Sequence, residues 1–252
     1  MGRLAEAKKL AMGQLRWDGK DIAKLKVASA MDLVTLGEIA LHRGDTGMAI
    51  SILEKARDKA KNASEVYGDE WIRAQIDIAL AEISLGSIQS AAEVAAATGL
   101  AAQRQWGANS IPAMDALDTL GLVQVAQSDF KNAEESLTFS RSWRQVIYQA
   151  DHPKIAASYL HAALLSAAQG RMDDAMGMVH RGLEIEKTVG IAPNGAWALA
   201  LLAGAEIYAK AGKTGDATSC YASAIPILER QLGADAPRLE QARKRYASLL
   251  AK

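Results

Sequence analysis

Residues 204–224 read GAEIYAKAGKTGDATSCYASA, and the small residues of this stretch recur through the chain at an interval of 42 residues. A set of positions spaced by this interval is termed a column. One column holds only alanine: Ala7, Ala49, Ala91, Ala133, Ala175 and Ala217. A second holds glycine with one exception: Gly2, Gly44, Gly86, Ser128, Gly170 and Gly212. Two more contain only small residues: Gly37, Ala79, Gly121, Ala163 and Ala205, then Ala56, Thr98, Ser140, Gly182 and Ala224. Such a register indicates an array of repeated units.

Composition favours helices and excludes several classes of partner. The chain has 252 residues, half of them hydrophobic and only 5% aromatic, and Ala and Leu, both good helix formers, dominate the apolar residues. Lys plus Arg equals Asp plus Glu at 29 each, so no overall field attracts nucleic acid or an anionic membrane. The single cysteine, Cys220, excludes an intrachain disulfide and is expected in the core. With no secretory leader or long apolar run, we expect a cytoplasmic protein.

Apolar spacing predicts a helix on each side of every glycine of the second column. The glycine itself is expected to end the preceding helix in a left-handed conformation. We expect an initial helix over 1–17, a helix capped by Asp21 that runs to about residue 42, and a single final helix over 237–251. Between them the pattern predicts helices over 48–67, 71–85, 91–105, 111–127, 130–147, 155–169, 172–188, 196–211 and 217–232.

The small columns explain how such helix pairs stack. Two helices joined by a tight turn leave one apolar face open until the next pair covers it. Ala or Gly in the columns of Gly37, Ala49 and Ala56 lets the helix axes approach to roughly 8–10 Å. Because no low-complexity linker interrupts the register, residues 1–252 are predicted to form one domain.

The columns resemble the tetratricopeptide (TPR) motif, W-x-x-L-G-x-x-Y followed by A-x-x-x-F and a small residue. The match includes Gly204, Ala205 and Tyr208, then Ala217, Tyr221 and Ala224. The period is 42 rather than 34 residues, and residues 151–156, DHPKIA, resemble the inter-repeat loop of the long, kinesin-light-chain-like type. This resemblance implies an all-α, right-handed superhelical solenoid of antiparallel helix pairs. It divides the chain into an N-terminal half-repeat and linker over 1–28, five full repeats over 29–235 and a C-terminal capping helix over 236–252.

No catalytic or cofactor motif accompanies the repeats. The sequence lacks HExxH, GxSxG, a phosphate-binding GxxxxGK[ST] loop and CxxC. Gly212-Lys213-Thr214 lacks the upstream glycine of a phosphate loop and occupies the turn column. The four histidines are spread along the chain: His42, His152, His161 and His180. We therefore expect no enzymatic activity, no cofactor and no metal.

The resemblance assigns a concave, partner-binding groove to the first helix of each repeat. Its lining columns are those of Met31, Val34, Thr35, Glu38 and Leu41, and together they form an apolar stripe with acids at one side. The predicted groove residues are Arg73, Ile76, Asp77, Leu80, Asp115, Asp118, Thr119, Leu122, Leu160, His161, Leu164, Leu202 and Glu206. Chaperone-binding members clamp a carboxylate with Lys, Arg and Asn in these columns, whereas here those positions are mostly Val, Ile, Asp and Leu. The alternative is that leucines such as Leu80 and Leu122 pack internally, and the sequence leaves both interpretations open.

Three hypotheses follow for function. The first is a non-catalytic scaffold that binds a peptide or helix of a partner protein in the groove. An amphipathic helix or extended apolar peptide with a basic side would complement Asp77, Asp115 and Asp118. The second is self-association through the terminal half-repeats, giving homo-oligomers. The third is the ligand-sensing part of a larger regulator or effector. None of these involves nucleic acid or membrane insertion.

Overall fold

The computed structural model describes residues 29–63, 67–148, 150–188 and 195–251, and in these ranges all regular secondary structure is helical. The helices are α2 (Ala30–Arg43), α3 (Thr46–Ala63), α4 (Asp69–Leu85), α5 (Ile88–Trp106), α6 (Ile111–Ala126), α7 (Phe130–Ile147), α8 (Pro153–Ala168), α9 (Met172–Thr188), α10 (Gly195–Lys210), α11 (Thr214–Leu232) and α12 (Pro237–Leu250). The all-α prediction is confirmed. The helix over 1–17 and Asp21 itself lie outside the described residues. The helix expected to start at Asp21 begins instead at Ala30, because Ser29 and Asp32 form a capping box there.

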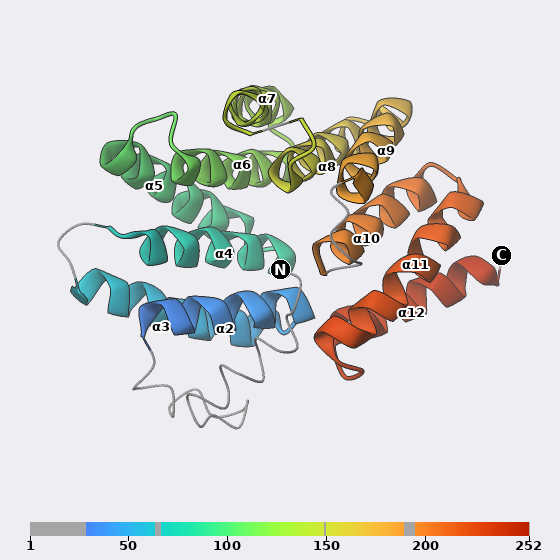
Figure 1. The fold of residues 1–252 in the computed structure, drawn as a ribbon, viewed down its shortest axis with the longest axis horizontal. Coiled ribbons are helices and arrows are strands. Elements are labelled where there is room, and N and C mark those ends of the chain that lie inside the picture. Colours follow the sequence, from blue (N-terminus) through green and yellow to red (C-terminus); the bar gives the residue numbers. More distant parts are fainter. Residues whose placement is uncertain (1–28, 64–66, 149, 189–194, 252) are drawn as a thin grey trace. The chain divides into compact units, whose positions relative to one another are not determined.

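The chain divides into two compact units at residue 128 (Figure 1). In the N-terminal unit, described over 29–127, α2 packs on α3, α3 on α4, α4 on α5 and α5 on α6. In the C-terminal unit, described over 128–251, α7 packs on α8, α8 on α9, α9 on α10, α10 on α11 and α11 on α12. Each unit is thus a sequential stack of helices, as the 42-residue register predicts. That the two units continue one solenoid stays a prediction.

Turn geometry follows the glycine column. Gly44, Gly86, Gly170 and Gly212 all have positive φ, between 72° and 87°. At the first of these turns the Gly44 amide donates to the Leu41 carbonyl at 3.1 Å and the Asp45 amide to the Ala40 carbonyl at 2.9 Å, which satisfies carbonyls left open at the end of α2. Ser128 adopts φ 62°, the sole positive φ of a non-glycine residue in the described ranges. The repeat therefore imposes the left-handed turn even where glycine is missing.

Small residues sit where helices approach most closely. Five alanines of the first column have no exposed surface: Ala49, Ala91, Ala133, Ala175 and Ala217. A Cβ added to Gly37 would lie 2.4 Å from Cγ of Leu53, and one added to Gly182 would lie 3.2 Å from the Ala156 carbonyl oxygen. Neither position has room for a larger side chain without displacement of the neighbouring helix. Cys220 is also buried, as predicted.

The start of α8 depends on a histidine. His152 occupies the N-cap position, and its Nδ1 accepts a hydrogen bond from the Lys154 amide at 3.1 Å. The imidazole stacks on Tyr148, with ring centroids 3.9 Å apart. Burial lowers the pKa of His152, and the nearby charges of Lys154 and Arg144 lower it further. The neutral ring is the form that can accept the capping hydrogen bond.

Enlarging a position of the alanine column should destabilise the stack. Ala175 lies in a buried cluster with Ala163, Val179 and Ile207. We expect Ala175→Phe to lower the free energy of unfolding by about 1–3 kcal/mol, because overpacking forces the helices apart. Urea denaturation followed by circular dichroism measures this. The exposed Ala168→Phe on α8 is the control, and equal stability of the two variants would contradict the predicted register.

The His152 cap predicts a pH dependence of known sign. Because folding lowers the pKa of His152 below its ordinary value of about 6.5, its contribution to stability is fully present above that pH. The contribution is lost as the pH falls through the folded pKa. Between pH 7 and pH 5 the Tm of the wild type should therefore fall more than that of His152→Asn, whose amide caps without titrating. Parallel Tm curves would show that the cap does not titrate.

Candidate functional site

First helices of successive repeats are neighbours in both units, as a groove requires. In the N-terminal unit α2 contacts α4 and α4 contacts α6, and in the C-terminal unit α8 contacts α10. Most residues of the predicted groove columns are half-buried, so they lie at a surface between core and solvent. The two units hold different members of the predicted set: eight lie on α4 and α6, and five lie on α8 and α10.

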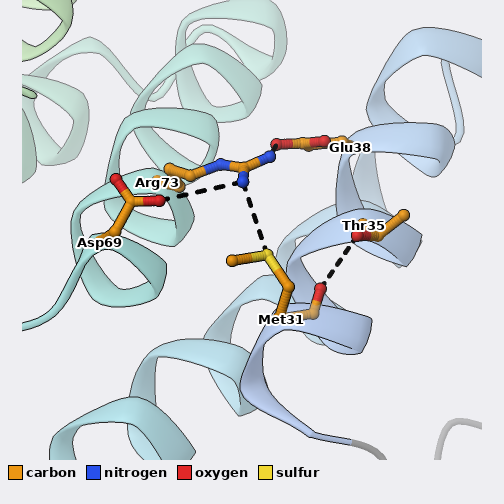
Figure 2. Close-up of polar contacts among 5 residues, drawn as sticks. All are labelled: Met31, Thr35, Glu38, Asp69 and Arg73. Carbon is orange, nitrogen blue, oxygen red and sulfur yellow. Dashed lines mark hydrogen bonds and ion pairs between the residues drawn. The ribbon is translucent and has the colours of Figure 1, made fainter. Parts of the chain in front are cut away.

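Arg73 connects α4 to α2 (Figure 2). Its Nη2 donates to Oε1 of Glu38, which occupies a groove column on the preceding first helix. Its Nη1 lies 3.9 Å from Oδ2 of Asp69, one turn earlier on α4, and 3.5 Å from the sulfur of Met31. One guanidinium thus contacts two carboxylates and the thioether of the neighbouring repeat.

Neighbouring carboxylates stabilise the positive charge of Arg73. Burial alone would disfavour the cation, but the hydrogen bond and charge of Glu38, with the charges of Asp69 and Asp77, outweigh it and raise the Arg73 pKa. A partner that used Arg73 would have to displace Glu38. We therefore assign Arg73 a bridging role between repeats, which the column pattern had not indicated.

The carboxylates of α4 and α6 differ in accessibility. Asp77 and Asp115 are half-buried. Asp118 is 4% exposed and Thr119 is 3% exposed, and the Thr119 hydroxyl donates to the Asp115 carbonyl at 3.0 Å. Of the three predicted acids, Asp77 and Asp115 are the ones that retain surface for a partner.

Several predicted groove leucines and isoleucines contribute to packing. Ile76 packs against the buried cluster that includes Trp71, and Leu80 packs against the cluster formed mainly by α2 and α3. Leu160 reaches α9, where a Cβ added to Gly182 would lie 3.3 Å from its Cδ2. Leu122 and His161 are half-buried on α6 and α8. The internal-packing interpretation therefore describes part of the stripe well.

The remaining members meet at a pocket of about 520 Å³ in the C-terminal unit, the C-terminal pocket. Its lining comes from α8, α10, α11 and α12: Leu164, Leu199, Leu202, Ala203, Glu206, Lys210, Tyr221, Arg238, Gln241, Ala242 and Arg245. Three of these, Leu164, Leu202 and Glu206, belong to the predicted groove set. Leu199 and Ala203 occupy groove columns as well. The C-terminal pocket therefore lies where several groove columns come together.

Glu206 organises the polar side of the C-terminal pocket. It accepts a hydrogen bond from the Tyr221 hydroxyl at 2.5 Å and pairs with Arg245, and so links α10 to α11 and α12. Burial, followed by the hydrogen bond and charge of Glu206, raises the pKa of Tyr221. Burial lowers the pKa of Arg238. With Lys210, the lining carries three cationic side chains against one carboxylate.

Sequence reasoning missed the contribution of α12. This helix was expected to be a cap, yet it supplies Arg238, Gln241 and Arg245 to the pocket. The signal was present in the register, because Gln241 and Arg245 continue the groove columns of Leu199 and Ala203 by one more interval of 42 residues. Arg245 lies in the lining of the C-terminal pocket and pairs there with Glu206.

The described part of the chain offers neither a metal site nor a membrane-spanning helix. Within it, no three His, Cys, Asp or Glu side chains gather closely enough to hold a metal ion. In the same ranges no helix combines the length and apolar character needed to cross a membrane. The C-terminal pocket is therefore the strongest candidate that follows from the predicted columns.

Comparison with known proteins places the fold. No protein-family model matches the chain, and no curated protein matches it. Among solved structures, a thermophilic TPR protein from Thermus thermophilus is 22% identical, with a TM-score of 0.57 over 89% of this chain and 100% of that chain. The Rap conjugation gene regulator of plasmid pLS20, solved with the Phr* peptide, is 15% identical, with a TM-score of 0.57 over 97% of this chain and 70% of that chain.

A third similar structure is BtubC (BKLC) from P. vanneervenii, 17% identical, with a TM-score of 0.55 over 97% of this chain and 91% of that chain. At such identities the likeness concerns the fold. The chain has the all-α fold of TPR-repeat proteins, as its columns predict. Assignment to the long, 42-residue type stays a prediction.

The hydrogen bond between Tyr221 and Glu206 should be measurable as a coupling energy. A double-mutant cycle of Tyr221→Phe and Glu206→Ala is expected to give about 1 kcal/mol, low for a charged hydrogen bond because the Glu206 side chain is one-third exposed. Urea denaturation of the four proteins measures it. The matched cycle with Tyr208→Phe should be additive, because residues two apart on a helix do not face each other. Additivity in both cycles would contradict the bond.

Proposed function

We propose that the chain is a non-catalytic interaction scaffold that binds a peptide or helix of a partner protein at the C-terminal pocket. The observation that carries this proposal is the convergence of the groove columns of α8, α10 and α12 on one hollow surface. Its volume of about 520 Å³ falls in the range of small-ligand and anchor sites. The bound Phr* peptide of the similar Rap regulator supports a peptide as the ligand.

The lining defines the chemistry of the partner. Leu164, Leu199 and Leu202 offer an apolar floor for one or two large side chains. Lys210, Arg238 and Arg245 outnumber Glu206, so the local charge favours an anionic group. We therefore propose an apolar anchor residue next to a carboxylate. The basic-sided partner expected from the sequence would instead suit Asp77 and Asp115 of the N-terminal unit.

Such a ligand would compete for the contacts that Arg245 makes. In the unbound chain Arg245 pairs with Glu206, while Tyr221 also donates to that carboxylate. If a ligand carboxylate paired with Arg245, Glu206 would keep its hydrogen bond from the Tyr221 hydroxyl. The exchange would therefore leave no buried charge without a partner. This arrangement makes Arg245 the member best suited to exchange partners.

The other two hypotheses stay predictions. Self-association was expected through terminal half-repeats, and the N-terminal one, residues 1–28, lies outside the described residues. A sensing role in a larger regulator is compatible with the same pocket.

Peptide display on the full-length protein tests the proposal. Selection against the wild type should enrich sequences with a large apolar residue next to Asp or Glu. We expect the double variant Leu164→Glu with Leu202→Glu to bind these peptides at least tenfold more weakly, because it places two carboxylates in the apolar floor. Isothermal titration measures the affinities. Val146→Glu, at a residue 74% exposed on α7, is the control.

Two results would contradict the proposal. One is selection that enriches no peptide although circular dichroism shows a folded protein. The other is an enriched peptide that binds the double variant as tightly as it binds the wild type.

A further inference from the structure

A second pocket lies in the N-terminal unit between α4 and α5, and none of the predicted groove residues lines it. This N-terminal pocket has a volume of about 460 Å³. Its lining residues are Tyr67, Trp71, Gln75, Ala97, Leu100, Ala101, Arg104 and Gln105. The first three follow one face of α4 and the chain just before it, and the others lie on α5.

Gln75 departs from the repeat register. Its column holds leucine in three other repeats, as Leu33, Leu117 and Leu201, and tyrosine in the fourth, as Tyr159. Gln75 is 7% exposed, as deeply buried as Leu33 and Leu201 are at 2% and 5%. An amide in a buried leucine position disfavours folding unless its polar atoms find partners. Packing therefore gives no reason for glutamine here.

Two polar atoms at the pocket have no hydrogen-bond partner in the structure. They are Oε1 of Gln75, an acceptor, and Nε1 of Trp71, a donor. Trp71 is 8% exposed, and it lies one helical turn before Gln75, so the two side chains are neighbours on α4. Buried polar atoms without partners are rare in native proteins and call for an explanation.

The surrounding walls are apolar and aromatic. Tyr67 stacks on Trp71, with ring centroids 4.2 Å apart and an interplanar angle of 27°. Leu100 is 56% exposed although it faces this aromatic pair across the pocket, and Ala97 and Ala101 lie beside it on α5. These groups suit a phenyl ring or a branched aliphatic chain.

We propose that the N-terminal pocket binds an apolar peptide segment through one main-chain amide. A peptide unit presents a carbonyl oxygen for Trp71 Nε1 and an N–H for Gln75 Oε1. Water or an alcohol also donates and accepts, but only through one oxygen atom, whereas a peptide unit does so from two separate atoms. The adjoining side chain, aromatic or branched, rests against Leu100 and the stacked rings. Both polar atoms have almost no solvent-accessible surface, so binding requires side-chain rotations that bring them to the pocket. This site is separate from the C-terminal pocket and does not depend on the function proposed there.

Matched small probes test the requirement for an amide. N-methyl-3-phenylpropanamide contains a peptide unit and a phenyl ring, whereas methyl 3-phenylpropanoate replaces only the amide N–H by an ester oxygen. Titration into the ¹⁵N-labelled full-length chain is followed at the indole N–H of Trp71, which is assigned by its absence in Trp71→Phe. The amide should shift this signal and bind about tenfold more tightly than the ester, because only the amide can donate to Gln75.

Gln75→Leu restores the leucine of the column and serves as the decisive variant. It should raise the Tm by a few degrees, since a buried polar atom is removed. In this variant the amide and the ester should bind equally. A raised Tm with the same preference for the amide would show that Gln75 is only a packing defect and would overturn the proposal. Equal binding of the two probes to the wild type, or binding of neither, would overturn it as well.

Discussion

Close approach of neighbouring helices is the constraint on which the rest of the structure depends. The five described alanines of the first column are fully buried, and Gly37 leaves no room for even a methyl group beside Leu53. Because these positions leave no spare volume, steric contact limits how closely neighbouring helices can approach. Polar side chains can then vary from repeat to repeat without loss of the stack. This separation explains how one register can carry an apolar stripe, an ion-pair bridge and two different pockets.

Most of the fold could be predicted from the sequence because its signals are local and repeated. The predicted bounds of α7, Phe130–Ile147, and α9, Met172–Thr188, match the structure, and the other described helices differ by a few residues at their ends, except for the start of α2. The start of α8 was placed late because a histidine cap is an unusual signal. The start of α2 was placed too early, at Asp21, although the capping box of Ser29 and Asp32 is a standard signal. The position of one unit relative to the other depends on contacts that no local pattern specifies.

The candidate site could be predicted only in part. Column spacing identified Leu164, Leu202 and Glu206, because residues at one helix position reach one face of the stack. Column spacing could not show that Arg73 forms an ion pair with Glu38, because the two residues lie in different columns of two successive repeats. Nor could it separate Leu80, which packs inward, from Leu164, which is 38% exposed, although both occupy the same column. Accessibility at a fixed helix position depends on what the next repeat brings against it.

A strict register also makes its exceptions informative. Ser128 departs from the glycine column, yet it accepts the same left-handed turn, so that exception changes energy and leaves the geometry intact. Gln75 stands where the same column has leucine in three other repeats, and its Oε1 has no hydrogen-bond partner. Nε1 of the neighbouring Trp71 has no partner either. The first exception is a tolerated imperfection of the scaffold. The second combines a cost to folding with the means to recognise a ligand, and such a combination is characteristic of binding sites.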